Sequence, residues 1–160
     1  ESGIITPEHS SMTWNGDAFP FPSWEADQDL NSAMQNSVNW YFQAIDSQLG
    51  INRVQEFLNK IEYGNQTTSS NLDLYWSDFS LKISPLEQVT LLKNLTQMIP
   101  SKFPKCISVK NAIKIASTPN GNFYGKTGTG RVNGQDINGW FIGYVETSDN
   151  SYYFATNNPK

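Results

Sequence analysis

The 160-residue sequence contains a single cysteine, Cys106, and a single histidine, His9. One cysteine cannot form an internal disulfide, and one of each is too few for a Cys/His metal site. No apolar run approaches the roughly 18 residues that span a bilayer. Basic side chains are also scarce: 11 Lys and Arg stand against 15 Asp and Glu, for a net charge of −4. This charge balance argues against a nucleic-acid-binding protein, which carries a basic surface.

Aromatic residues, in contrast, are abundant. The nine Phe, seven Tyr and five Trp supply enough large apolar side chains to build a core, so the chain is not expected to be disordered. A length of 160 residues suits one domain. We predict a single domain over residues 1–160, with a mostly helical part over 1–120 and a sheet part over 121–156.

The first long apolar pattern follows residue 29. Apolar side chains recur at steps of three and four residues from Leu30 to Leu49, which predicts one face of an amphipathic helix. Gly50 suits the C-terminal cap of that helix. Ser37 and Asn39 lie beside this face, so they belong either near a helix start or in a break within the helix.

Three further helices are predicted before residue 120. One covers residues 51–61, which carry apolar residues at helical spacing. The next begins at Ser84, because Ser84 can cap the free N–H groups, Pro85 fits the first helical position and Glu87 completes a capping box. A short helix is expected over residues 109–116.

The last forty or so residues change to the alternating pattern of strands. We predict strands over residues 123–132, 137–146 and 151–156. Asn133-Gly134 is a strong signal for a tight hairpin between the first two. Helices followed by an antiparallel meander indicate an α+β fold.

Residues 12–24 are rich in Pro, Trp and Phe and show neither helical nor strand periodicity. We expect an ordered, irregular segment that is packed by its aromatic side chains. Aromatic platforms also serve as binding surfaces. A non-covalent glycan- or protein-binding module is therefore one alternative function.

A glycine-rich stretch with one lysine, residues 125–130, falls within the first predicted strand. It is not a phosphate-binding loop, because the glycine of the Walker spacing is absent and no helix follows. Glycines in a strand let another backbone or a ligand come close. Lys126 adds a cation there, and Thr127 and Thr129 add hydroxyls. With Gly128 between them, this stretch can hold a carboxylate and offer N–H groups to a carbonyl oxygen.

Two short motifs, Ser37-Val38-Asn39 and Lys126-Thr127-Gly128, together resemble signatures of active-site-serine penicillin-recognising proteins. Further stretches extend the resemblance to class D β-lactamases, and more closely to β-lactam sensor domains of the BlaR and MecR type. These stretches are residues 27–34, 37–42, 63–65, 75–76, 80–88, 126–130 and 138–144. The resemblance covers nearly the whole chain and implies a β-lactamase/transpeptidase-like fold, with an antiparallel sheet flanked by helices and an all-helical region.

The resemblance also implies roles for individual residues. In this family a nucleophilic serine opens the lactam ring and forms an acyl-enzyme. Ser37 would pass a proton to the departing lactam nitrogen, and Lys126 would polarise Ser37 and attract the carboxylate of the antibiotic. The Thr129 N–H would be one of two donors to the oxyanion, and Trp76 would pack beside the catalytic lysine. The residues expected to line the substrate site are Asn39, Trp76, Thr127, Gly128 and Thr129.

The chain departs from the family in one respect, because it contains no Ser-x-x-Lys motif. That motif supplies the attacking serine and its lysine, and in the family it precedes the segment that residues 1–5 resemble. We therefore expect the sequence to be incomplete at its N-terminus, and also at its C-terminus, where a strand and a helix are missing. As it stands, the chain is not expected to be acylated.

Asn39 distinguishes two functions within the family. Class D β-lactamases usually have an apolar residue there, which helps to keep the neighbouring lysine carbamylated as the deacylating base. An amide favours the free amine, so the acyl-enzyme persists. We therefore favour the extracellular sensor domain of a bacterial membrane receptor, which binds β-lactam antibiotics and signals through the metalloprotease part of the same receptor.

The alternative within the family is a class D β-lactamase that hydrolyses β-lactams, secreted or periplasmic. No metal or cofactor is expected for either function, apart from a carbamate on a lysine outside the chain. No nucleic-acid partner is expected.

Overall fold

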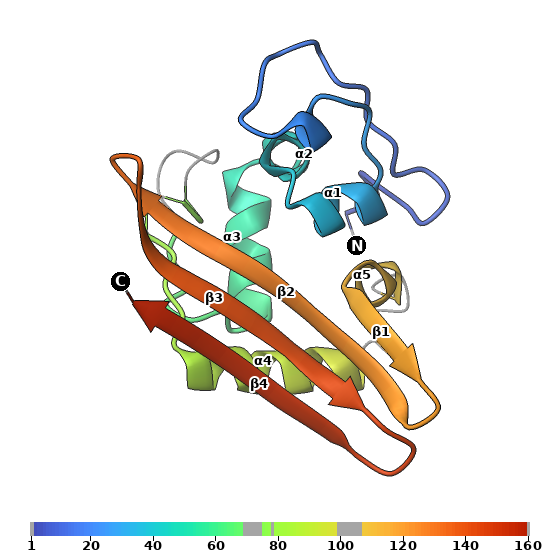
Figure 1. Cartoon of the computed structure of the whole chain (residues 1–160). Coiled ribbons are helices and arrows are strands. Elements are labelled where there is room, and N and C mark those ends of the chain that lie inside the picture. Colours follow the sequence, from blue (N-terminus) through green and yellow to red (C-terminus); the bar gives the residue numbers. More distant parts are fainter. Residues whose placement is uncertain (1, 69–74, 78, 99–106, 160) are drawn as a thin grey trace.

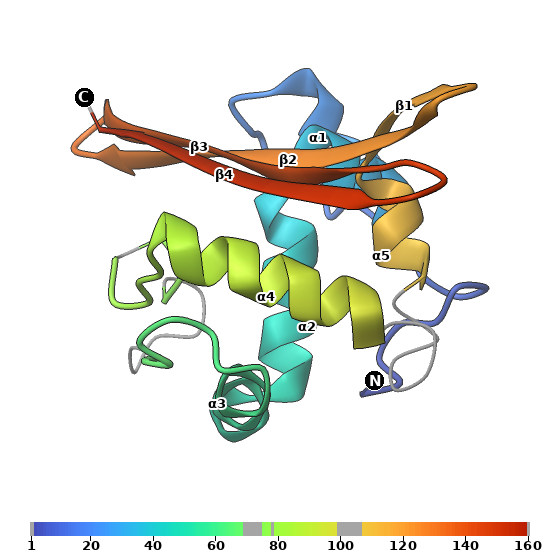
Figure 2. The same cartoon turned by 90° about the horizontal axis from the view of Figure 1, so that it is seen from below.

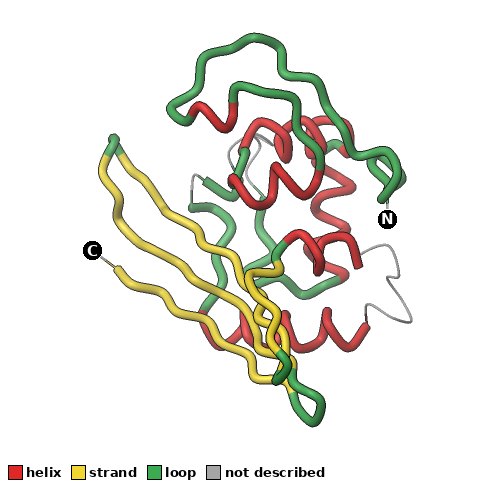
Figure 3. Tube along the Cα trace, turned by 45° about the vertical axis from the view of Figure 1, so that its right-hand side comes forward, coloured by secondary structure: helices red, strands yellow, loops and turns green. Residues whose placement is uncertain are grey.

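The computed structural model describes residues 2–68, 75–77, 79–98 and 107–159 (Figure 1). The elements, in chain order, are a 3-10 helix (Pro22–Trp24), α1 (Leu30–Asn36), α2 (Asn39–Leu49), α3 (Ile51–Lys60), α4 (Pro85–Met98), α5 (Ile107–Ala112), β1 (Lys114–Thr118), β2 (Gly121–Val132), β3 (Gln135–Glu146) and β4 (Ser151–Pro159). Figure 3 separates the sheet from the helices that flank it. The predicted α+β class is confirmed.

The four strands form one antiparallel sheet in the order β1-β2-β3-β4. β2 and β3 pair along nearly their whole length, from Asn122 opposite Glu146 to Val132 opposite Gln135. The turn between them is the predicted Asn133-Gly134 hairpin, in which the two residues have φ values of 49° and 78°. Positive φ at both positions is what a type I′ turn requires. The three predicted strands are confirmed.

The first strand corrects one prediction. The helix expected over residues 109–116 ends at Ala112, and residues 114–118 form β1. β1 pairs with the start of β2, with Thr118 opposite Gly121. For residues 114–118, the hydrogen bonds to β2 therefore outweigh the local helical pattern, because strand pairing and packing commonly override the intrinsic propensity of a segment.

The apolar face predicted from Leu30 to Leu49 exists, but two helices share it. α1 ends at Asn36, its cap residue Ser37 has a left-handed backbone (φ 54°, ψ 47°), and α2 begins at Asn39. The N–H of Val38 donates to the carbonyl of Ala33 at 2.9 Å, which is the bond that closes a Schellman-type helix end. Val38 is fully buried in the same cluster as Ala33. Of the two positions left open for Ser37, the break is the observed one.

The helical layer covers one face of the sheet. Figure 2 shows α4 and α5 on one side of the strands, with α3 farthest away. Thr96 of α4 shares a hydrogen bond of 2.7 Å with Tyr153 of β4. The predicted capping box begins α4, because the Ser84 N–H donates to Glu87 at 2.8 Å and the Glu87 N–H donates to Ser84 at 3.3 Å. The inner face of the sheet is thus the face that meets the helices.

Candidate functional site

Ser37 and Lys126 meet where the end of α1 approaches β2. Lys126 Nζ donates a short hydrogen bond to the Ser37 hydroxyl, across 89 residues of sequence. The same nitrogen donates to the backbone carbonyl of Thr127 at 2.9 Å. The structure therefore brings together the first residue of each motif, one from the end of α1 and one from β2, here called the Ser37–Lys126 pair.

Burial changes the acid–base behaviour of Lys126. Its side chain is partly buried, and the loss of hydration lowers the pKa of its amine below the usual value. An amine with a lowered pKa exchanges a proton more readily near neutral pH than a solvated lysine does.

Ser37 has a left-handed backbone, a costly conformation that persists only where its surroundings hold it. Both features are typical of a functional site.

One edge of β2 is open next to this pair. The N–H of Gly125 points to the β1 side, where it donates to the carbonyl of Ile113 at 2.9 Å. Alternate residues of a strand present their backbone groups to the same edge, so Thr127 and Thr129 also face the β1 side. β1 pairs only with the start of β2, and both threonines are exposed. Within the described chain, the N–H groups of the two threonines face an edge that a ligand can reach, whereas the Thr127 carbonyl already accepts from Lys126.

A bulge ends this open edge. The register between β2 and β3 shifts at Gly130 and Arg131, and the Gly130 N–H donates to the side-chain oxygen of Asn138 at 3.0 Å. A Cβ at Gly130 would collide with that same oxygen, so the contact requires glycine. Asn138 therefore fixes the end of the glycine-rich stretch to β3.

Asn39, Trp76 and Gly128 lie outside the hydrogen bonds of the pair. Asn39 is the exposed first residue of α2, and Gly128 is exposed on β2. Trp76 packs against a buried cluster that includes residues of α3. Among the described residues, none of the three hydrogen-bonds to the Ser37–Lys126 pair.

Asn65 holds the loop that carries Trp76. Its side chain donates to the carbonyl of Ser80 at 2.8 Å and accepts from the N–H of Lys82 at 2.9 Å. The Ser80 hydroxyl in turn donates to the carbonyl of Tyr75 at 3.0 Å, next to Trp76. The motif at residues 63–65 therefore acts as a clamp on this loop.

Two tryptophans to which the sequence assigned no role in the site lie beside Ser37. The Trp24 indole N–H donates to the carbonyl of Asn36 at 3.1 Å, and the Trp40 indole N–H donates to the carbonyl of Trp24 at 2.9 Å. The aromatic composition of residues 12–24 predicted packing or a binding platform. No sequence signal indicates which backbone carbonyl an indole will reach.

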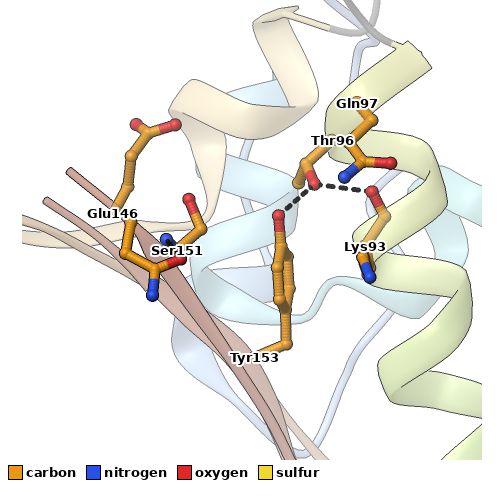
Figure 4. Close-up of a pocket in the computed structure, with 7 residues that line it drawn as sticks. Lys93, Thr96, Gln97, Glu146, Ser151 and Tyr153 are labelled. Carbon is orange, nitrogen blue, oxygen red and sulfur yellow. Dashed lines mark hydrogen bonds between the residues drawn. The ribbon is translucent and has the colours of Figure 1, made fainter. Parts of the chain in front are cut away.

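A cavity of about 420 Å³ lies elsewhere, between α4 and the sheet. Figure 4 shows the side chains that line it from the two sides, Lys93, Thr96 and Gln97 against Glu146, Ser151 and Tyr153. Its carboxylate, Glu146, already pairs with Lys110 at 2.9 Å, and its Thr96 and Tyr153 hydroxyls bond to each other. Since its lining residues do not include the Ser37–Lys126 pair, the candidate site remains beside β2.

The described part of the chain contains no cluster of acidic, His or Cys side chains suited to a metal ion. Cys106 lies outside the described residues, and His9 is exposed in the N-terminal loop.

Among the residues that the structure describes, no helix combines the length and the apolar character that crossing a membrane requires.

Comparison with known proteins identifies the family. The family described as penicillin binding protein transpeptidase domain matches residues 1–116 and 108–160. The chain is 44% identical over 157 residues to the methicillin resistance mecR1 protein of Staphylococcus aureus, and 47% identical over 156 residues to regulatory protein BlaR1 of Bacillus licheniformis. These matches cover 98% and 97% of the chain but only 27% and 26% of the relatives, so the chain spans about a quarter of their length.

Solved structures agree with this assignment. The C-terminal domain of the Bacillus licheniformis BlaR penicillin-receptor superposes with a TM-score of 0.91 at 45% identity, covering 98% of this chain and 63% of that one. A class D β-lactamase from Nostoc gives a TM-score of 0.92 at 31% identity, covering 100% of this chain and 68% of that one. The predicted resemblance is thus confirmed in sequence and in fold. The chain belongs to the family of penicillin-binding protein transpeptidase domains, and BlaR1 and MecR1 are among its close homologues.

Proposed function

We propose that the chain is the β-lactam-binding part of a receptor that senses the antibiotic through a long-lived acyl-serine. The observation that carries this proposal is the hydrogen bond from Lys126 to Ser37 beside the open edge of β2. The similarity to BlaR1 and mecR1 over nearly the whole chain supports it. The class D β-lactamases, at 31–37% identity, are more distant.

The reaction that this site supports is acyl transfer. A serine of the Ser-x-x-Lys motif, which this sequence does not contain, attacks the carbonyl carbon of the lactam. An ester C–O bond forms, the ring C–N bond breaks, and the nitrogen takes up a proton. Ser37 delivers that proton from its hydroxyl and regains one that originates on the attacking serine. No co-reactant is therefore consumed.

Lys126 and the two exposed threonines provide the electrostatics. Because Lys126 Nζ donates to the Ser37 oxygen, the hydroxyl proton of Ser37 is free to point toward the substrate. The cation also attracts the carboxylate of a β-lactam, with the Thr127 hydroxyl nearby. The Thr129 N–H faces the open edge and donates to the developing oxyanion. In other enzymes, removal of such a donor raises the activation free energy by about 3–4 kcal/mol.

The fate of the acyl-serine separates a receptor from a hydrolase. Asn39, two positions after Ser37, places an amide where an apolar side chain would favour carbamylation of the motif lysine. A free amine leaves no base to activate water, so the ester persists. A persistent ester gives a stable signal, whereas turnover would erase it.

The remainder of the receptor is the partner in this proposal. It comprises a transmembrane part and a metalloprotease domain, which acylation outside the cell switches on. The chain accordingly faces the outer side of the bacterial membrane. The printed names of the relatives, a methicillin resistance protein and a regulatory protein, support a role in antibiotic resistance.

The test mixes the protein that includes the Ser-x-x-Lys segment with a chromogenic cephalosporin. We expect release of one molar equivalent of product and then a halt. Lys126→Ala should slow acylation by roughly a hundredfold, because the proton donor Ser37 loses its partner. Sustained turnover by the parent protein would identify a class D β-lactamase instead.

Asn39→Val tests the role of the amide in the same assay. With bicarbonate present, we expect slow turnover to replace the halt, because the motif lysine can then carry a carbamate. Asn31→Val is the matched control, since Asn31 is an exposed asparagine on α1. If product release by Asn39→Val stops after one molar equivalent, as in its control, the persistence of the ester has another cause.

A non-covalent binding module is less well supported. Trp14 and Trp24 use their indole N–H groups on backbone carbonyls within the chain, at 2.8 and 3.1 Å, so these two N–H groups are not free to bind a ligand. That function predicts ligand binding that survives Lys126→Ala.

A further inference from the structure

We infer that Trp24 is a positioning residue for Ser37. The indole N–H of Trp24 holds Ser37 in place by binding the backbone carbonyl of the preceding residue, Asn36. This inference rests on the proposed function, because it gives Trp24 a part in acylation. Trp24 itself lies in the irregular aromatic segment, as the last residue of the 3-10 helix.

The contact acts on a single peptide group. Trp24 Nε1 donates to the Asn36 carbonyl at 3.1 Å, and that carbonyl shares one planar peptide with the Ser37 N–H. The Ser37 N–H donates to the carbonyl of Met34 at 3.3 Å. With both ends of the peptide hydrogen-bonded, its plane resists rotation, and Ser37 keeps its φ of 54°.

Ser37 needs this restraint because the left-handed region is unfavourable for a residue with a Cβ. The same backbone angle directs the Ser37 hydroxyl across to Lys126 on β2. Rotation of the Asn36–Ser37 peptide toward the right-handed region would carry the hydroxyl away from Lys126. The carbonyl that Trp24 binds therefore controls whether the proton donor faces its partner.

Trp24 is itself held from two sides. The rings of Phe19 and Phe21 lie 5.8 and 5.4 Å from its ring, centroid to centroid. The Trp40 indole N–H donates to the Trp24 carbonyl at 2.9 Å, and Trp40 lies on α2 just after the break. The two indoles thus link the end of α1 to the start of α2, with Ser37 between them.

The test substitution is Trp24→Phe, which keeps a ring against its aromatic neighbours but removes the N–H. In the full-length protein, we expect the acylation rate constant to fall about fivefold to tenfold. Reversible binding of the cephalosporin should change little, because Ser37 acts on the bond-breaking step. Trp14→Phe is the matched control: Trp14 donates to the Asp17 carbonyl at 2.8 Å in the same segment, and we expect its rate to be unchanged.

A second substitution separates positioning from a general loss of structure. In a Ser37→Ala background, Trp24→Phe should have no further effect on acylation, because the residue through which it acts is already lost. An equal loss of rate in both backgrounds would overturn the inference. So would a Trp24→Phe rate equal to that of the parent.

Hydrogen exchange of the Ser37 amide gives a readout that needs no antibiotic. We expect exchange to speed up about fivefold to tenfold in Trp24→Phe and to stay unchanged in Trp14→Phe. Equal exchange rates in Trp24→Phe and the parent would overturn the inference even if acylation had slowed. Failure of the parent protein to react with the cephalosporin would instead count against the proposed function, and the exchange experiment would still decide the role of Trp24.

Discussion

Ser37 combines a backbone conformation that lowers stability with a hydroxyl that the candidate site needs. Its left-handed backbone (φ 54°) is a strained conformation for a residue with a Cβ, yet its hydroxyl is the partner of Lys126. A glycine would suit the helix end better, as it does in most Schellman motifs. Serine at this position therefore indicates that chemistry, rather than stability, determines the residue.

Ser37→Gly is expected to exceed Ser37→Ala in free energy of unfolding by about 1 kcal/mol, because the strain at the Cβ is relieved, and to slow acylation strongly. Ser37→Ala is the matched variant, since it removes the same hydroxyl but keeps the Cβ, and it should give no gain in stability. Urea unfolding and the cephalosporin rate measure the two effects. A Ser37→Gly protein no more stable than Ser37→Ala would show that the backbone angle is not costly here.

At the scale of elements, α5 ties the helical layer to the sheet. α5 contacts α1, and Lys110 on α5 donates to both carboxylate oxygens of Glu146 on β3, each at 2.9 Å. Lys110 also lies 5.1 Å from the centre of the Tyr124 ring. Through these contacts, α5 connects α1, which precedes Ser37, to β3 and to β2, the strand that carries Lys126.

Lys110→Met is expected to lower the free energy of unfolding by about 1–2 kcal/mol, because a two-oxygen, partly buried ion pair is lost. Arg53→Met provides the control: the Arg53–Glu56 pair is longer, at 3.5 Å, and its side chains are 56% and 66% exposed. Such surface pairs contribute about 0–1 kcal/mol. Equal losses in the two variants, measured by urea unfolding, would show that α5 is not braced by Lys110.

Elements that depend on neighbours in sequence could be predicted. The capping box at Ser84 and the Asn133-Gly134 turn each involve residues a few positions apart, so the local sequence is sufficient. β1 could not be predicted in this way, because residues 114–118 gain their hydrogen-bond partners only when β2 lies beside them. The local pattern there favoured a helix.

The candidate site shows the same division. The Ser37–Lys126 pair joins residues 89 positions apart, and only the family resemblance connected them. The contact between Trp24 and Asn36 depends on how the irregular segment folds back over α1. An indole has one N–H and many carbonyls within reach, so neither composition nor motif spacing could identify the acceptor.

At the scale of the whole molecule, buried tyrosines set the response to alkaline pH. Burial is the main cause that raises the pKa above the usual 10.0 for Tyr41, Tyr63, Tyr75, Tyr124 and Tyr144. Above pH 10 the unfolded chain releases protons that the folded chain keeps, so stability falls as the pH rises. Lys126 makes the opposite contribution to the pH dependence of stability. Its pKa is lowered in the folded chain, so below pH 10.5 the unfolded chain binds more protons there and stability rises with pH.

We therefore expect the free energy of unfolding, measured in urea, to fall above about pH 10. Tyr144→Phe should lessen that fall and cost little at neutral pH, because the buried Tyr144 hydroxyl has no hydrogen-bond partner among the described residues. Tyr152→Phe is the control, since Tyr152 is 60% exposed. An identical alkaline fall in the parent and in Tyr144→Phe would contradict the assignment to Tyr144.

The open edge of β2 also affects how molecules of this protein meet one another. A strand edge with free backbone groups can accept a strand from a second chain, and natural sheets discourage this with charged side chains that point inward. Lys126 is such a charge, partly buried beside exposed Thr127 and Thr129. The lysine that holds the proton donor therefore also discourages edge-to-edge aggregation, so a variant that loses Lys126 is expected to lose solubility together with reactivity.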